Sequence, residues 1–356
     1  MSIIALPLIP LNEYAGIFYQ GANVAVALLV AGRLSDHVGR RPVLLAVTAA
    51  QAVTMLIFMQ ADSTSTLLVA RLIQGLVTGT AVAAAGAGML DIDKRAGGVG
   101  NSVAPQAGTA LGGVLGGLFV QYLPAPTLLV YVVLAGVYVA QLAGVACMSE
   151  TTSGRNGAWK SLAPTLALPA AARLPVLLAL PTLVAIWALA GFYASLGPKL
   201  MRSITTEHAV VLGGFALFVF SAAGATSGLL SQRLSAARLM TISPIALLAG
   251  LGMLAAAIAQ SSVNMFMLGS AVLGAGFGTG FQGAIRSVVA QAGAQERAGV
   301  LSVLFIVSYL SMGVPSILAG YRLASSGDIR GTAEEFGIAM LVLAMAAMAA
   351  RLRSPR

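Results

Sequence analysis

Residues 32–42 read GRLSDHVGRRP, a short charged stretch between two long apolar segments, 14–32 and 43–61. Glycine has no β-carbon, so Gly32 and Gly39 permit a tight turn and close packing. Pro42 suits the first turn of a helix, where its missing N–H would have no partner in any case. The stretch therefore predicts a compact loop that ends one helix and starts the next.

Composition places the whole chain in a membrane. Of its 356 residues, 58% are hydrophobic and only 9% are charged, whereas soluble proteins carry about 25% charged residues. The net charge of +9 comes from Lys and Arg that stand singly or in small groups between apolar segments, which argues against nucleic acid as a partner. A single cysteine, Cys147, allows no disulfide framework. We expect a multi-pass protein of the cell membrane.

Eleven apolar segments are long enough to cross a bilayer as helices. They lack the alternating pattern of barrel strands, and lipid requires every backbone group to pair internally, so an all-α membrane fold is expected. The apolar residues before Asn12 are too few to cross, and we expect them to be the outer end of a truncated first helix. The segments are 14–32, 43–61, 66–90, 97–121, 126–148, 175–198, 209–231, 240–260, 263–291, 298–321 and 333–350.

Basic residues indicate the orientation, because Lys and Arg favour cytoplasmic loops. If the 32–42 loop is cytoplasmic, alternate loops place fifteen of the twenty basic residues on that side, four outside and Arg71 within a span. The C-terminus is then cytoplasmic. The polar interval 149–173 is expected to be a cytoplasmic linker between an N-terminal bundle, 1–148, and a C-terminal bundle, 174–356.

The 32–42 stretch resembles the signature loop of the major facilitator superfamily, Gly-x-Leu-Ala/Ser-Asp-x-x-Gly-Arg-Arg/Lys between helices 2 and 3. The resemblance implies two helical bundles that rock around a central cavity, and eleven full helices here. It also implies that Asp36 approaches the start of helix 11, near Arg297, and that Arg40 approaches Asp91 at the end of helix 4. The loop is thus expected to be a conformational latch, whose residues are Gly32, Asp36, Gly39, Arg40, Arg41 and Asp91.

A second match is Arg71-Leu-Ile-Gln74-Gly75, which is similar to the family's helix 4 pattern Arg-x-x-Gln-Gly. A guanidinium at membrane depth is costly unless it faces water or partners, so Arg71 is a candidate for the substrate cavity. The alternative is that Arg71 extends to the outer interface or has a structural role.

Glycines at 108, 112, 113, 116 and 117 resemble the family's helix 5 antiporter motif, except that Gly113 replaces the expected proline. The substitution weakens an inference of export. Small residues four apart also let two membrane helices approach closely, so Gly108, Gly112, Gly113, Gly116 and Gly117 form a candidate helix-packing motif.

An internal repeat supports the resemblance. Residues 228–234, GLLSQRL, fall in register with residues 32–38, GRLSDHV, 196 positions earlier. The second copy has Gln232 where the first has Asp36. Two parallel repeats around a midplane cavity are typical of such transporters.

Catalytic chemistry is not indicated. All eleven acidic residues fall at span ends or in loops, and neither His37 nor His208 has metal-ligand spacing. Phosphate-binding and hydrolase motifs are absent from the sequence, so we expect no enzyme activity and no cofactor. The family resemblance implies that helices 1, 4, 7 and 10 line the cavity, which favours Arg71, Gln74, Trp187, Tyr193 and Gln282 as substrate residues.

These patterns predict a monomeric secondary transporter that works by alternating access. One arginine and few acids in the cavity suit neutral or anionic small molecules. Export, coupled to protons, is the first hypothesis for its direction. Uptake of a small organic anion is the alternative, and a degenerate, non-transporting membrane protein is the rival from another class.

Overall fold

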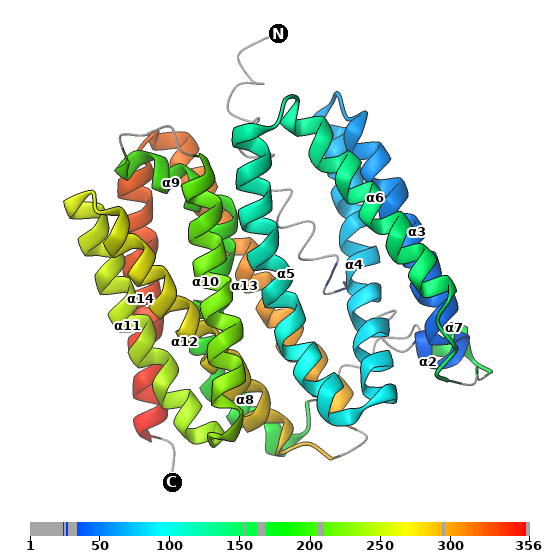
Figure 1. Cartoon of the computed structure of the whole chain (residues 1–356). Helices are drawn as coiled ribbons and strands as arrows, with labels where there is room; N and C mark the ends of the chain where they lie inside the picture. Colours follow the sequence, from blue (N-terminus) through cyan, green and yellow to red (C-terminus); the bar gives the residue numbers. More distant parts are fainter. Residues whose placement is uncertain are drawn as a thin grey trace. The chain divides into compact units, whose positions relative to one another are not determined.

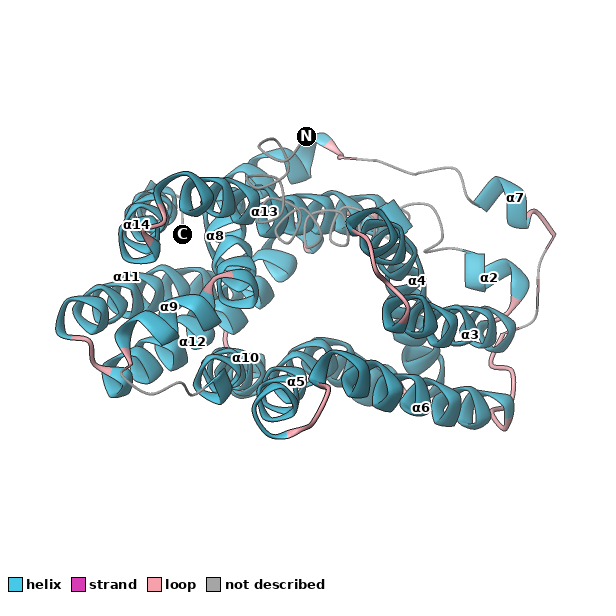
Figure 2. Cartoon of the chain, turned by 90° about the horizontal axis from the view of Figure 1, so that it is seen from above, coloured by secondary structure: helices cyan, strands magenta, loops and turns pink. Residues whose placement is uncertain are grey.

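The computed structural model describes residues 24, 26–27, 34–152, 154, 156–161, 168–205, 210–293 and 296–353. Throughout these residues the chain is built from helices and connecting loops, with no strand (Figures 1 and 2). The expected all-α membrane fold is therefore confirmed. The predicted segment 14–32, and Gly32 with it, lies almost wholly outside the described residues.

The helices keep the order of the predicted spans (Figure 1). Two short helices, α2 and α7, precede α3 and follow α6 in the chain, and a third, α9, follows α8. The elements are α2 (Leu34–Val38), α3 (Arg40–Met59), α4 (Thr64–Ile92), α5 (Lys94–Tyr122), α6 (Pro126–Ala146), α7 (Ala158–Ser161), α8 (Ala170–Ser195), α9 (Gly197–Ile204), α10 (Val210–Leu230), η1 (Ser231–Arg233), α11 (Ala236–Gln260), α12 (Val263–Val289), α13 (Arg297–Ser326) and α14 (Ile329–Arg353).

Ten of these helices are long and apolar enough to cross a membrane. Each one overlaps one of the ten predicted segments from 43–61 to 333–350, with ends that differ by a few residues. The agreement follows from length and hydropathy alone, since a helix rises about 1.5 Å per residue and a bilayer core is about 30 Å thick.

The described helices form two compact units. Unit 1 contains Ser102–Gln121 from α5 together with the described part of Leu166–Arg356, and unit 2 contains the described part of Ala15–Asn101 and of Tyr122–Thr165. Most of α5 thus groups with the C-terminal helices. The bundles 1–148 and 174–356 stay a prediction.

Unit 1 holds the larger core, in which α12 packs between α10 and α11. Glycines on α12 explain the closeness of this packing. A methyl group at Gly274 would overlap the Phe220 carbonyl oxygen on α10, and one at Gly276 would lie 3.3 Å from Ala246 Cβ on α11. Small residues let helix backbones approach, which strengthens dispersion contacts where no hydrophobic effect drives association.

In unit 2, α3 packs against both α4 and α6. Two small apolar clusters hold the three helices together, one around Val43 and Val47 and the other around Met55 and Phe58. None of the apolar window of α6 is buried within the structure. Such exposed apolar faces fit hydrocarbon and would be unfavourable in water.

Candidate functional site

Arg40 is the centre of the described part of the signature loop. Its Nη1 lies 2.5 Å from Asp36 Oδ1 and donates to Ser35 Oγ at 2.6 Å, while its Nε donates to Asp91 Oδ2 at 3.0 Å. Arg40 is only 6% exposed. These contacts join α2, the first turn of α3 and the last turn of α4. Burying a cation is costly, and the two carboxylate partners compensate that cost, so Arg40 can keep its charge in this buried position.

A carboxylate from outside the loop caps α3. Glu150 Oε1 accepts from the Arg40 backbone N–H at 2.9 Å and Oε2 accepts from the Arg41 N–H at 3.0 Å. The N–H groups of Thr151 and Thr152 donate to Oε1 as well, at 3.0 and 3.1 Å. First-turn N–H groups have no partner within their own helix, and the helix dipole favours an anion there. Glu150 therefore anchors the start of the linker to the start of α3.

Gly39 makes this cap possible. Its φ of 112° belongs to the region that residues with a β-carbon rarely adopt. A methyl group there would also lie 2.6 Å from Glu150 Oε2. The glycine predicted for a tight turn thus has a second purpose, which is to leave room for the capping carboxylate.

The electrostatics of Glu150 follow from its four N–H partners. Partial burial acts to raise the pKa of its carboxyl group, but the backbone N–H groups of Arg40, Thr152, Arg41 and Thr151 together outweigh it and hold the pKa below its ordinary value of 4.5. Hydrogen bonds to the charged form of a carboxylate have this effect. Glu150 is consequently ionised, and able to accept all four bonds, at neutral pH.

Other contacts hold the start of the linker against the residues around Arg40. Arg41 Nη2 donates to the Ala146 carbonyl oxygen at 2.5 Å, and Thr151 Oγ1 donates to Asp91 Oδ2 at 3.4 Å. The short helix α7 contacts α2. Sequence patterns did not single out Glu150, which is one of eleven acids at span ends or in loops. The available signal was its place just after a span, on the same predicted side as the signature loop.

The structure brings Asp36, Gly39, Arg40, Arg41 and Asp91 together in unit 2. The expected contact between Asp36 and the start of helix 11 would join the two units, so it stays a prediction. The latch role of the loop also stays a prediction.

On α4, Arg71 and Gln74 are bonded to each other, since Arg71 Nη1 donates to Gln74 Oε1 at 2.7 Å. The guanidinium carbon of Arg71 lies 4.8 Å from the ring centre of Phe58 on α3. Phe58 in turn stacks on Tyr131 of α6, with ring centres 5.0 Å apart. Arg71 therefore takes part in a contact that links α3, α4 and α6, and its contact with cargo stays a prediction.

Trp187 on α8 lies in a group of aromatic rings contributed by three helices. Its ring centre is 5.3 Å from Tyr309 on α13, 5.5 Å from Phe281 and 5.6 Å from Phe277, both on α12. Trp187 is half-buried. Its indole N–H has no hydrogen-bond partner among the described residues. The indole nitrogen is shielded from solvent, and a buried donor without a partner is unfavourable, so an acceptor that reached this N–H would be stabilised there.

Tyr193, further along α8, has a different environment. It is 2% exposed, stacks on Phe220 at 4.7 Å and shares a 2.8 Å hydrogen bond with Ser270 Oγ. These contacts place Tyr193 in the core of unit 1. Its contact with cargo stays a prediction.

Gln282 on α12 is bonded to protein groups on both sides of its amide. Its Nε2 donates to the Gly228 carbonyl oxygen at 2.6 Å, and its Oε1 accepts from Arg286 Nη2 at 2.6 Å. Arg286 Nη1 donates to the carbonyl oxygens of Gln232 and Leu234, each at 3.1 Å. Gln282 and Arg286 thus fix the end of α10 and the turn that leads to α11. The predicted cavity role of Gln282 is untested.

The glycines of α5 divide into two faces. A methyl group at Gly113 would lie 2.9 Å from the Gly214 carbonyl oxygen on α10, and one at Gly117 would lie 3.2 Å from Val211 Cα. Methyl groups at Gly108, Gly112 or Gly116 would meet nothing within 4 Å among the described residues. Gly113 and Gly117 therefore lie at a helix–helix contact within unit 1.

Comparison with known proteins agrees with this architecture. The family model described as Major Facilitator Superfamily matches residues 14–242. No curated protein sequence matches the chain significantly. Many solved structures share the fold, among them two transporters of low sequence identity.

The first is the human organic anion transporter MFSD10 (TETRAN), with a TM-score of 0.66, 16% identity, and coverage of 95% of this chain and 83% of that one. The second is a point mutant of the nucleoside transporter NupG, with a TM-score of 0.72, 15% identity, and coverage of 97% and 94%. The family match extends over more than half of the chain, and the folds agree over nearly all of it. The chain belongs to the major facilitator superfamily and is a membrane transporter of small molecules, not an enzyme.

Proposed function

We propose that the chain transports a small molecule with a planar ring, neutral or anionic, by alternating access. The aromatic group around Trp187 is the observation that carries this proposal. The half-buried rings of Trp187, Phe281 and Tyr309, packed beside the buried Phe277, form an aromatic surface suited to stacking, and the unbonded indole N–H is a donor that cargo could satisfy. Ligand sites are commonly apolar with a few well-placed polar groups.

The charge of the cargo is inferred from the titratable groups. Within the described residues every acid lies near a span end or in a loop, so no mid-span carboxylate is available to pair with a cation. The two similar transporters described above are named for organic anions and for nucleosides. Both classes fit a neutral or anionic cargo, and a nucleoside carries a planar base.

For the direction, we propose export coupled to protons. Support comes from the likeness of the α5 glycines to an antiporter motif, with Gly113 as the departure. Vesicles of reconstituted protein with an imposed pH gradient would test it. If a nucleoside or aromatic carboxylate accumulates on the side that protons leave, cargo and protons move in opposite directions, which supports proton-coupled export. If it accumulates on the side that protons enter, the two move together, which favours uptake. Absence of any gradient-dependent flux for every probe would favour a degenerate protein.

Fluorescence gives a direct test of the cargo site, because Trp159 and Trp187 are the two tryptophans of the chain. In a Trp159→Phe protein all indole emission comes from Trp187. Titration with nucleosides and aromatic carboxylates should quench that emission with saturation. Trp159 is 87% exposed on α7 and makes Trp159→Ala the matched control in transport assays.

In the same assays, Trp187→Ala should lower transport about tenfold or more, equivalent to losing a stacking contact with its hydrogen bond. Trp187→Phe keeps a ring without the N–H, so its transport rate should lie between those of the wild type and Trp187→Ala. Thermal unfolding of each variant separates lost binding from lost packing. Unchanged transport in Trp187→Ala together with unquenched Trp187 would exclude the site.

Arg71 provides an independent test in unit 2. If it contacts cargo, Arg71→Ala should weaken transport much more than it lowers the amount of folded protein, and Arg71→Lys should restore it only partly because lysine lacks the planar fork. If Arg71 only links helices through Phe58, both substitutions should lower thermal stability and transport in proportion. Full activity in Arg71→Lys would remove Arg71 from the substrate site.

A further inference from the structure

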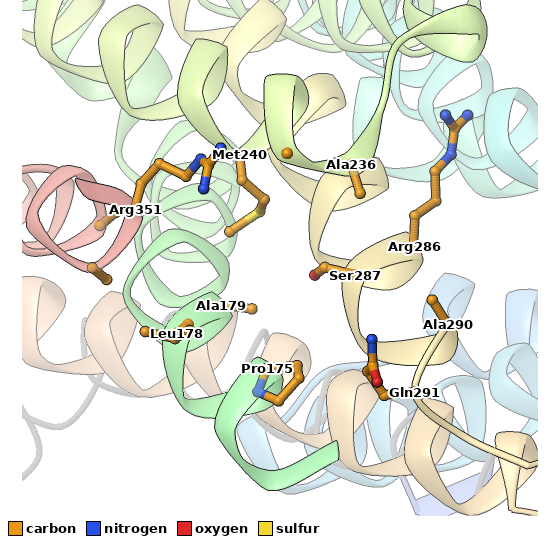
Figure 3. A pocket seen from close by; sticks show the side chains of 13 residues that line it. Pro175, Leu178, Ala179, Ala236, Met240, Arg286, Ser287, Ala290, Gln291 and Arg351 are labelled. Atoms are coloured by element: carbon orange, nitrogen blue, oxygen red, sulfur yellow. The ribbon is translucent and has the colours of Figure 1, made fainter. Parts of the chain in front are cut away.

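A pocket of about 400 Å³ opens at the end of unit 1 where α8 and α11 begin and α12 and α14 end (Figure 3). Its wall is largely apolar, with Pro175, Leu178, Met240 and several alanines. The polar exceptions are Arg286, Ser287, Gln291 and Arg351. In Figure 3, Arg286 and Arg351 lie on opposite sides of the pocket, with Ser287 between them.

Positive charge at this pocket is not neutralised by the protein. No carboxylate in the described part of the chain pairs with Arg286 or Arg351. The contrast is Arg40, which has two carboxylate partners. Arg286 donates hydrogen bonds to the Gln232 and Leu234 carbonyl oxygens and to the Gln282 side chain, all of which are neutral. A cation without a counter-ion in a concave site attracts an anion.

Some hydrogen-bond donors at the pocket also have no partner in the described part of the chain. Arg351 donates through Nε to Thr241 Oγ1 at 3.0 Å, and its two terminal nitrogens have no hydrogen-bond partner among the described residues. Ala236 and Ala237, the first two residues of α11, line the same pocket. The N-terminal turn of a helix presents free N–H groups and a positive dipole end. The free terminal nitrogens of Arg351 and the N-terminus of α11 are donors of the kind that a phosphate requires, and Arg286 adds positive charge although its own bonds go to protein oxygens.

The surroundings of the pocket favour a lipid over a soluble phosphate. Close to its lining residues, Leu174 and Leu177 on α8 are 60% and 61% exposed, and Leu352 on α14 is 79% exposed. Ile242 on α11 is exposed as well. These side chains belong to spans or their ends and provide an apolar approach to the pocket. An acyl chain can follow that surface, whereas a soluble phosphate gains nothing from it.

We propose that this pocket binds the headgroup of an anionic phospholipid, with its phosphate between Arg286 and Arg351 and an acyl chain along Leu178 and Met240. The predicted orientation places the pocket at the cytoplasmic leaflet, where anionic lipids attract basic groups near the membrane surface. Bound lipid joins α8, α11, α12 and α14 at one end of unit 1. Because it binds the folded protein, it raises thermal stability increasingly as its concentration exceeds Kd.

The test uses the purified full chain in neutral detergent, titrated with phosphatidylglycerol, phosphatidylcholine or glycerol 3-phosphate and followed by thermal unfolding and native mass spectrometry. Phosphatidylglycerol should raise the melting temperature and remain bound, and the other two should not. Equal stabilisation by phosphatidylcholine would overturn the requirement for an anion. Equal stabilisation by glycerol 3-phosphate would assign the pocket to soluble phosphates instead of lipid.

Point variants test whether the lipid binds in this pocket. Arg351→Gln should weaken phosphatidylglycerol binding about tenfold or more, and Arg351→Lys should weaken it less. Arg238→Gln removes an equal charge from the exposed first turn of α11, outside the pocket lining, and should leave binding unchanged. Ala290→Phe should block binding at unchanged charge, because Ala290 lines the pocket. Equal losses in Arg351→Gln and Arg238→Gln, or wild-type binding in Ala290→Phe, would overturn the pocket assignment.

Discussion

The starts of α3 and α11 occupy equivalent places in the internal repeat, yet the protein caps them differently. Gly39 and Ser235 are 196 positions apart and each precedes a membrane helix. Ser235 caps its own helix, because its side chain accepts from the Arg238 N–H. Gly39 has no side chain, and the cap of α3 is Glu150 from the linker.

The cations of the two corners differ in the same way. In the α3 corner, defined by Gly39, Arg40, Asp91 and Glu150, the arginine comes from the loop and its partners are carboxylates. In the α11 corner, defined by Ser235, Gln282 and Arg286, the arginine comes from α12 and its partners are carbonyl and amide oxygens. One repeat position can therefore be stabilised by carboxylates or by neutral groups. Both corners use partners about 50 positions away for their arginines, but only the α3 corner takes its helix cap from a distant residue and depends on the ionisation of carboxylates.

The largest expected effect is that of Gly39→Ala. Alanine must adopt a positive φ and displace Glu150, so the unfolding free energy should fall by about 2 to 4 kcal/mol. Thermal unfolding in detergent measures it. Ser235→Gly, the reciprocal change in the α11 corner, should cost only a few tenths of a kcal/mol. Gly136→Ala is the control, because a methyl group at this position on α6 would meet nothing within 4 Å. If Gly39→Ala lowered the unfolding free energy no more than Gly136→Ala does, the α3 corner would be able to accommodate the methyl group, and the proposed strain would be refuted.

Arg40→Ala should have the next largest effect. It leaves Asp36 and Asp91 without their buried partner, and because both carboxylates keep access to solvent the loss should be about 2 kcal/mol. Transport should fall while membrane insertion persists, as expected of a latch. Asp36→Asn should act in the same direction but more weakly. Wild-type transport by both variants, with unchanged accessibility of the two membrane sides, would refute the latch.

Ser235→Ala tests the neutral cap and should cost about 1 kcal/mol. Hydrogen exchange of the first turn of α11 should increase, while that of α3 should not change. Ser235→Asp keeps an acceptor and should retain most of the stability. An effect of Ser235→Ala as large as that of Gly39→Ala would erase the distinction between the corners.

The smallest effect concerns pH. Because folding lowers the pKa of Glu150 below its ordinary 4.5, the stability it contributes is full above that value and is lost as pH falls further. As pH falls from 4.5 through the lowered pKa of Glu150, the first turn of α3 should become more accessible to exchange or cysteine labelling than at pH 7. The first turn of α11 should not, since Ser235 does not titrate there. Glu150→Gln should abolish the difference, and an unchanged pH response in that variant would refute the assignment.

Hydropathy predicted the ten described spans because membrane helices are specified by a long apolar run and little else. The signature loop was also predictable, since Gly39 and Arg40 lie within a short contiguous pattern. Glu150 was not, because its partners on α3 are about 110 positions away, and its place just after a span indicates its side of the membrane but not its partner. The structure supplied the three-dimensional pairing that a single sequence lacks.

The candidate cavity residues were harder to judge for a related reason. A polar side chain in a span can face cargo or bond to another helix, and the residue type is the same in both cases. Gln282 bonds to Gly228, and Tyr193 bonds to Ser270. Likewise the glycine spacing of α5 did not reveal which face meets α10, because both 108–112–116 and 113–117 repeat every four residues.

The distant cap of α3 also constrains the order of events during synthesis. Ser235 can cap α11 as soon as that helix forms, but α3 must wait until the ribosome has added 110 more residues. At about 5 to 20 residues per second, that delay is about 5 to 20 s. Helices α4, α5 and α6 are made in the interval, while the first turn of α3 has no carboxylate. A nascent chain arrested before Glu150 should therefore be cleaved by protease near Gly39, and one arrested after the linker should be protected.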